Sequence, residues 1–130
     1  MKMEIVSAGG KKVNALYKGF TIKTDQSKEY GGDESAPEPF DMFLASIGTC
    51  VGINIIVFCQ RHSISTEKIQ LILLFERNQK TKMIEKIKIE IQLPMDFPEK
   101  YKKAVIRLAD LCSVKKHMIN PPEFEIYTNT

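Results

Sequence analysis

The sequence predicts an α+β domain with its elements in the order βββ–α–ββ–α–β. Three observations lead to this fold class. Segments in both halves of the chain show the period-two alternation of antiparallel strands. A long run that begins at Pro39 repeats apolar residues at helical spacing, and a shorter amphipathic run follows Pro98. The length of 130 residues suits one domain, and we expect residues 1–130 to form it.

The composition excludes several classes of protein. Hydrophobic residues make up 43% of the chain and charged residues 27%, which argues against disorder. The net charge is +3, and no segment is basic enough to indicate nucleic-acid binding. The N-terminal segment has no apolar core of signal-peptide length, and the longest apolar run, residues 51–58, is shorter than a membrane span. We therefore expect a cytoplasmic protein with no nucleic-acid or membrane partner.

The first 38 residues predict a small meander followed by a long loop. Strands are expected near residues 3–7, 12–17 and 20–24, and Lys18-Gly19 fits a two-residue hairpin turn. Residues 25–38 are polar and glycine-rich, so they predict a loop. An irregular segment of that length in a compact domain is usually functional.

A long helix is predicted to begin at Pro39, because proline is favoured at the first helical position. Asp41 suits the positive end of the helix dipole. Apolar residues surround most of the helix as far as Gln60, so we expect it to be buried, either centrally or in an oligomer interface. Gly48 and Gly52, four residues apart, indicate the close approach of another element.

The rest of the chain predicts a hairpin, a second helix and a last strand. Residues 67–77 and 83–93 read as paired strands, the second with isoleucine on one face and lysine or glutamate on the other. The second helix is expected over about residues 98–112. Pro121-Pro122 prevents further helix, and Phe124 and Ile126 predict a short final strand.

Three cysteines, Cys50, Cys59 and Cys112, are the candidates for redox chemistry. Their odd number excludes a disulfide scaffold, and the two isolated histidines offer no zinc-ligand spacing, so we expect no metal. At about 100° per residue, Cys59 faces away from Cys50 and is expected to be structural. Cys50 and Cys112 can lie close enough to form a pair if the second helix ends beside the first. A free cysteine on an apolar helix is most often a small buried hydrophobe, so both interpretations remain.

Several motifs resemble those of the OsmC/Ohr family, the osmotically inducible and organic hydroperoxide resistance proteins. The run of residues 36–50, APEPFDMFLASIGTC, is similar to the central-helix signature of the family. Residues 111–114, LCSV, look like its second cysteine signature, and residues 8–11 and 28–32 resemble two further landmarks. The chain is identified by this resemblance as a divergent OsmC-like member.

The resemblance implies an OsmC-like fold, with antiparallel sheets packed around a long central helix in an interwoven homodimer whose active sites lie at the subunit interface. It implies a thiol peroxidase that reduces organic hydroperoxides in oxidative-stress defence. Cys50 would form a sulfenic acid, and Cys112 would resolve it to a Cys50–Cys112 disulfide. No bound cofactor is implied, and the expected reductant is an external dithiol of the lipoyl type.

Two positions depart from the family pattern. Family peroxidases place an arginine after the Gly-Gly of the first turn, where this chain has Lys11 and then Lys12. Lys11 or Lys12 is the expected thiolate partner, although lysine lacks the planar fork of arginine. Family peroxidases also carry a glutamate where this chain has Phe40. Asp41, one residue later, is the candidate acidic helper, but it lies half a turn out of phase with Cys50 and also suits a cap of the helix dipole or a position facing the loop. These changes leave an alternative, a non-catalytic or redox-sensing dimer that binds a small ligand on the same fold.

Overall fold

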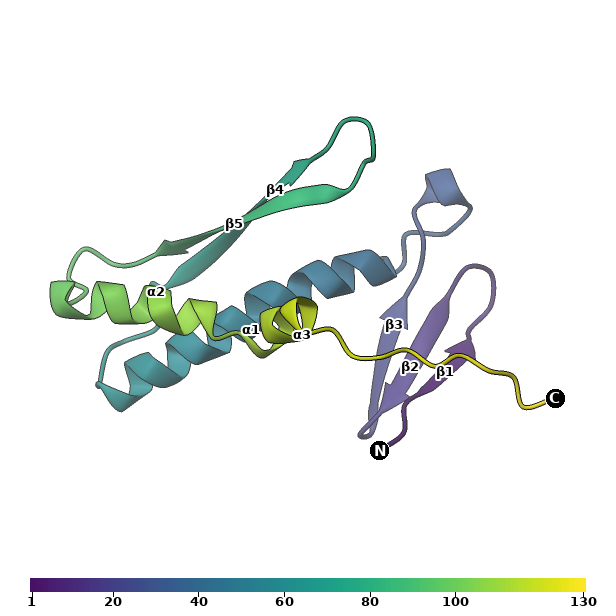
Figure 1. Cartoon of the computed structure of the whole chain (residues 1–130), viewed down its shortest axis with the longest axis horizontal. Helices are drawn as coiled ribbons and strands as arrows, with labels where there is room; N and C mark the ends of the chain where they lie inside the picture. The colour runs from purple at the N-terminus through teal and green to yellow at the C-terminus, as the bar shows by residue number, and fades with distance from the viewer. The chain divides into compact units, whose positions relative to one another are not determined.

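The computed structural model describes residues 1–130 and has the α+β composition expected, with antiparallel sheets and helices (Figure 1). Two compact units divide the chain, Met1–Ala45 and Ser46–Thr130. The boundary falls inside the long helix, so each unit is described by itself.

The first unit contains a three-stranded antiparallel sheet in the order β1–β2–β3. Its strands are β1 (Glu4–Ser7), β2 (Val13–Tyr17) and β3 (Phe20–Thr24). Tyr17 pairs with Phe20 across the second turn, where Lys18 has φ 52° and Gly19 has φ 80°. Positive φ at both central residues is the geometry of a type I′ turn, so the predicted two-residue hairpin is confirmed.

Helix α1 (Pro39–Arg61) begins at the expected proline. The backbone N–H of Glu38 donates to Oδ2 of Asp41 at 3.0 Å, so this carboxylate acts at the start of the helix. By length and composition α1 could cross a membrane, and its most apolar window is 22% buried in the single chain. The apolar stretch that meets this criterion is therefore longer than the run of residues 51–58. Core helices of soluble proteins meet the same criterion, so length and composition assign it no location.

The second unit packs a hairpin and two helices against α1. The hairpin consists of β4 (Gln70–Arg77) and β5 (Ile84–Gln92), with Leu73 opposite Ile89. A 3₁₀ turn, η2 (Glu99–Tyr101), leads into α2 (Lys102–Asp110), and α3 (Ser113–Ile119) follows. The buried core joins residues from α1, α2 and their connections: Val51, Ile55, Cys59, Phe97, Val105 and Cys112.

The two glycines of α1 behave differently. A methyl group on Gly48 would lie 3.2 Å from Cδ1 of Leu73, whereas one on Gly52 would meet no atom within 4 Å. Close approach by another element is therefore confirmed at Gly48, where β4 lies against the helix. In the single chain no other element lies against Gly52.

The end of the chain differs from the expected order in two ways. The second helix ends at Asp110, and residues 113–119 form a separate helix, α3, that the sequence did not predict. Residues 120–130 contain no strand, because no neighbouring strand of this chain pairs with them (Figure 1). The observed order is therefore βββ–α–ββ–α–α.

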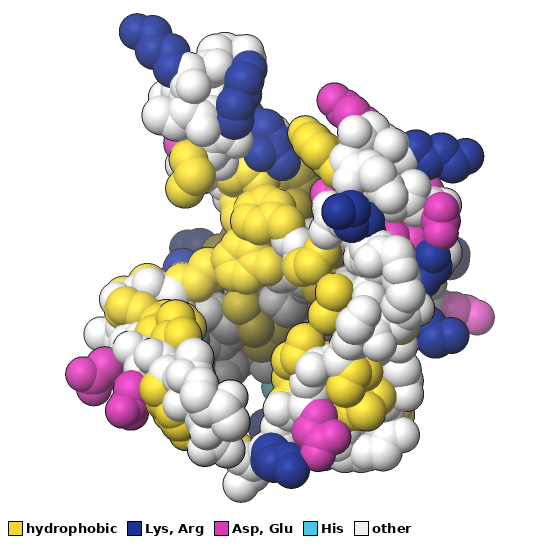
Figure 2. Space-filling view, turned by 90° about the vertical axis from the view of Figure 1, so that its right-hand side faces the viewer, with side chains coloured by type: hydrophobic (Ala, Val, Ile, Leu, Met, Phe, Trp, Pro, Cys, Tyr) yellow, Lys and Arg dark blue, Asp and Glu magenta, His cyan; other side chains and the backbone are white.

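Many apolar side chains remain exposed in the single chain, and hydrophobic side chains are visible at the surface in Figure 2. On α1 only Ile47, Val51, Ile55 and Cys59 are buried. Ile53 on the same helix is 53% exposed, and Phe124 and Ile126 in the tail are 80% and 93% exposed. The helix, which was expected to be buried either centrally or in an oligomer interface, thus has an uncovered side in the single chain.

Candidate active site

The second unit brings Cys50 and Cys112 together from segments far apart in the sequence. Cys50 lies on α1 and packs, half-buried, against the core cluster that contains Cys112. The chain leaves α2 where the N–H of Leu111 bonds to the carbonyl of Leu108. Cys112 then adopts an extended backbone, φ −62° and ψ 125°, immediately before the first residue of α3. This change of direction places the sulfur of Cys112 beside α1.

The sulfur of Cys50 is surrounded by hydrogen-bond donors. The backbone N–H of Val114 is the strongest, and the thiol of Cys112 and the N–H of Ser113 add to it. Amide groups in the first turn of a helix have no partner within that helix, so they are free to donate outward. These donors lower the pKa of the Cys50 thiol, against the opposing effect of burial.

Cys112 has the opposite electrostatic setting. Its side chain is fully buried, and burial raises the pKa of its thiol. The neighbouring Cys50 raises that pKa further, while the N–H groups of Lys115 and Val114 lower it. Cys50 is therefore the more readily ionised of the two thiols. A nucleophilic thiolate next to a protonated thiol is the arrangement in which a first oxidation at one sulfur can be resolved by the other.

Residues 31–127 match the family model described as OsmC-like protein. The chain belongs to this family. No curated protein is a significant match to the sequence.

Solved structures place this OsmC-like protein in the same fold. A Psychrobacter arcticus protein assigned to osmotic stress induction and detoxification response has a TM-score of 0.74 at 18% identity, over 89% of this chain and 86% of that one. An OsmC-like protein of unknown function from Vibrio cholerae gives 0.61 at 10% identity, covering 89% and 92%. The organic hydroperoxide resistance protein OsmC of Legionella pneumophila gives 0.53 at 15% identity, covering 91% and 89%. At these identities the likeness shows the fold.

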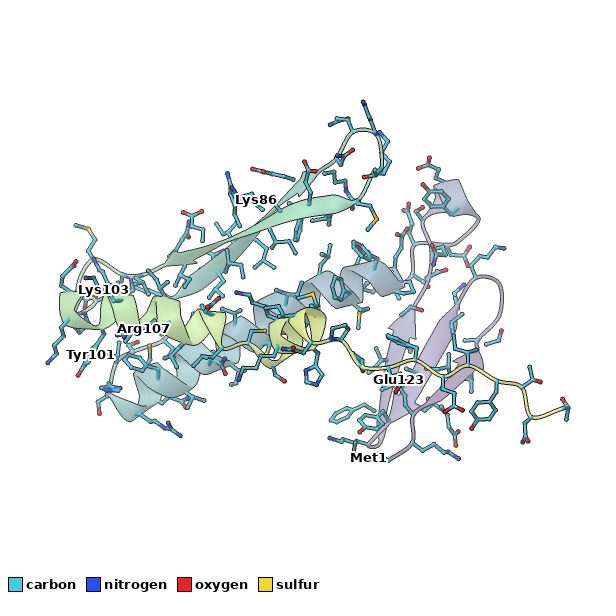
Figure 3. All side chains as sticks on the ribbon, in the orientation of Figure 1. Met1, Lys86, Tyr101, Lys103, Arg107 and Glu123 are labelled. Atoms are coloured by element: carbon cyan, nitrogen blue, oxygen red, sulfur yellow. The ribbon has the colours of Figure 1, made fainter.

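A cavity of about 530 Å³ reaches Cys112 in the OsmC-like protein. Cys112 lines it, whereas Cys50 contacts Cys112 from the side of α1. Its apolar walls come from α1, β5, α2 and α3: Ile47, Val51, Ile84, Ile87, Ile89, Ile106, Ala109 and Met118. The charged residues around it are Glu85, Lys86, Arg107, Asp110 and Lys115, of which Lys86 and Arg107 are labelled in Figure 3. Such a cavity suits an apolar organic molecule.

Sequence reasoning missed the donors to Cys50 and the cations around the cavity. The amides of Ser113 and Val114 have no sequence signal, because any residue supplies an N–H. Arg107 carried a weak signal, since it lies on the second helix shortly before Cys112. Its position on the cavity depended on which face of α2 turns toward β5.

The predicted helper residues Lys11, Lys12 and Asp41 belong to the other unit, Met1–Ala45. Lys12 forms ion pairs with Asp25 and Asp33, and Asp41 accepts the N–H of Glu38. Lys11 is exposed. Their roles beside a thiolate stay predictions.

Cys59 lies in the core of the second unit, fully buried, and burial raises the pKa of its thiol. A cysteine in this setting acts as a small apolar side chain. No group of three or more His, Cys, Asp or Glu side chains is arranged to hold a metal ion.

Proposed function

We propose that this protein is a cytoplasmic, homodimeric thiol peroxidase that reduces organic hydroperoxides, with Cys50 as the peroxidatic and Cys112 as the resolving cysteine. The observation that carries the proposal is the hydrogen-bonded contact of the two thiols, with the pKa of Cys50 lowered and that of Cys112 raised. Membership of the OsmC-like family supports it. The fold shared with the organic hydroperoxide resistance protein of Legionella pneumophila supports it by analogy.

The proposed cycle has three balanced steps. The thiolate of Cys50 attacks the terminal oxygen of ROOH, the O–O bond breaks, and the alcohol ROH leaves after taking up a proton, while sulfur becomes a sulfenic acid. The thiol of Cys112 attacks that sulfur, water leaves, and a Cys50–Cys112 disulfide forms. An external dithiol, which we propose to be of the lipoyl type, then reduces the disulfide and becomes a disulfide itself.

In family peroxidases an arginine stabilises the thiolate. In this protein the hydrogen-bond donors around Cys50 would stabilise it instead. The N–H groups of Val114 and Ser113 favour the charged sulfur, so a thiolate forms at a pH where an isolated thiol is mostly protonated. The cavity beside Cys112 supplies apolar walls for the organic part of the peroxide. A proposed cytoplasmic location fits free cysteines, because thiols stay reduced there.

Uncovered apolar surface supports the homodimer. Ile53 on α1 and Phe124 and Ile126 in the tail are more than half exposed. These groups would leave water if a second copy covered them. Exposed backbone in the tail could pair with a strand of a second copy, as the alternation of Phe124 and Ile126 with Glu125 suggests. Light scattering on the wild type and on Phe124→Asp/Ile126→Asp tests this, with a dimer expected for the first and dissociation for the second.

The decisive experiment measures reduction of cumene hydroperoxide with dihydrolipoamide as the reductant. We expect Cys50→Ser to abolish turnover. Cys112→Ser should make the sulfenic acid but lose repeated turnover, and dimedone should trap that acid at Cys50. Cys59→Ser is the matched control and should turn over like the wild type. A wild-type protein that consumes no organic hydroperoxide with any dithiol would contradict the proposal.

A second candidate function is a non-catalytic or redox-sensing dimer that binds a small apolar ligand. The cavity of about 530 Å³ favours it, because an apolar cavity serves binding with or without chemistry. The two candidates differ in the first oxidation. A wild-type protein that binds an apolar fluorescent probe, while its Cys50 reacts with peroxide no faster than a free thiol, would favour binding over catalysis.

A further inference from the structure

The carboxylate of Asp25 is the fully buried acid of the first unit. Three groups donate to its Oδ2 and Oδ1 from close range: the Oγ of Ser35 at 2.6 Å, the N–H of Ser35 at 3.0 Å and the N–H of Gln26 at 2.8 Å. The N–H of Asp33 adds a longer contact at 3.3 Å. These donors, the Ser35 hydroxyl first, hold the pKa of Asp25 well below its usual range. A buried carboxylate with this many donors stays ionised and organises the backbone around it.

Asp25 fastens both ends of the loop of residues 25–38. Its own N–H donates to the carbonyl of Pro37 at 3.1 Å, which joins the end of β3 to the residue two places before α1. Gly32 passes so close to the backbone of Gln26 that a Cβ there would lie 2.1 Å from its carbonyl oxygen. The loop is therefore tightly folded, and only glycine fits at position 32.

Lys12 is the cation of this arrangement. It ends the turn between β1 and β2, where its N–H donates to the carbonyl of Gly9. Its Nζ lies 3.9 Å from Oδ2 of Asp25 and forms a hydrogen-bonded ion pair with Asp33. The hydrogen bond to Asp33 raises the pKa of Lys12. One ammonium group therefore bridges the buried end and the exposed tip of the loop.

Lys11 differs from its neighbour. Its side chain is exposed and has no ion pair in the structure. Its Cε lies against Gly31, 3.3 Å from the place a Cβ would occupy. The Lys11 side chain thus lies against the same loop, and no carboxylate forms an ion pair with it.

We propose that Lys12 is a positioning residue that fastens the loop of residues 25–38 to the turn between β1 and β2. The loop leads directly into Pro39, the first residue of α1. Fastening the loop therefore fixes the backbone that leads into the start of this helix.

Limited trypsin digestion tests the fastening without any assay of activity. Lys28 is exposed within the loop, so cleavage after it reports how often the loop opens. We expect Lys12→Met and Asp33→Asn each to speed this cleavage several-fold. The double variant should be no faster than Lys12→Met, because Lys12→Met already removes the ion pair with Asp33. Lys12→Arg should restore slow cleavage.

Lys23→Met is the matched control, since it removes an exposed lysine of the neighbouring strand that has no ion pair. Cleavage at the wild-type rate in both Lys12→Met and Asp33→Asn would overturn the fastening role. So would equal acceleration by Lys23→Met, which would show a general effect of lost charge. Asp33 is 73% exposed, so Asp33→Asn tests the bridge even if Lys12→Met fails to fold.

A protein that keeps the protease result but lacks peroxidase activity would contradict the proposed function alone.

Discussion

Cys50 and Cys112 lie in hydrogen-bonded contact, and the pKa of the Cys50 thiol is lowered while that of the Cys112 thiol is raised. The cause is local. Backbone amides of Val114 and Ser113 face Cys50, whereas Cys112 is fully buried. Two chemically identical side chains thereby acquire different reactivities, and this difference can be measured before any substrate is known.

We predict that iodoacetamide labels Cys50 with a midpoint pH below that of a free thiol, about 8.5, because a lowered pKa makes the thiolate available sooner. Cys112→Ala removes a donor and should move the midpoint upward. Cys112→Ser keeps a donor and should move it less. Mass spectrometry of labelled peptides checks the assignment, and Cys59 serves as the unreactive reference. Equal rates at all three cysteines would contradict the asymmetry.

The two glycines of α1 should respond differently to the same substitution. Gly52→Ala meets no atom within 4 Å and should raise the stability by up to about 1 kcal/mol, the helix-propensity difference. Gly48→Ala brings a methyl group 3.2 Å from Leu73, so this gain should be reduced or reversed. Urea unfolding curves measure both. A Gly52→Ala protein that is less stable than the wild type would show that another chain occupies the space beside Gly52.

Ile55→Ala should destabilise the protein by about 2–5 kcal/mol, because Ile55 is fully buried in the core of the second unit. Ile106→Ala is the matched control. It removes the same atoms from a side chain that is 64% exposed in the single chain. Its loss of stability should be much smaller. Denaturant unfolding compares the two, and similar losses would contradict the burial described for the single chain.

The lowered pKa of Asp25 predicts acid sensitivity of the first unit. A group whose pKa is depressed in the folded state stabilises the protein above its unfolded pKa, about 3.9, and loses that contribution as the pH falls toward the folded value. The wild type should therefore be more stable than Asp25→Asn at pH 7, and the difference should shrink below about pH 4. The charges that face Asp25 are Lys12 and, through Lys12, Asp33.

Thermal unfolding from pH 7 to pH 3 measures this difference. Ser35→Ala is a milder variant, because it removes one donor and keeps the carboxylate. It should show a smaller loss with the same dependence on pH. A difference that stays constant down to pH 3 would show that Asp25 does not titrate as described.

Local patterns predicted most of the elements. The Lys18-Gly19 turn, the start of α1 at Pro39 and the alternation of isoleucine along β5 all appear as expected. These features depend on neighbouring residues and on the period of one element, which a sequence contains in full. The predicted final strand failed for the opposite reason. Phe124 and Ile126 have the pattern of a strand, but a strand needs a partner, and the single chain offers none.

The sequence by itself determined the family, the three cysteines and the choice of Cys50 and Cys112 as the pair of interest. Only the tertiary structure decided which thiol is activated and what Lys12 does. Both depend on contacts between distant segments: the first turn of α3 against α1, and the β1–β2 turn against the loop before α1. Hydrogen-bond donors and buried charges act over a few ångströms in space, and residue spacing along the chain does not state which groups come that close.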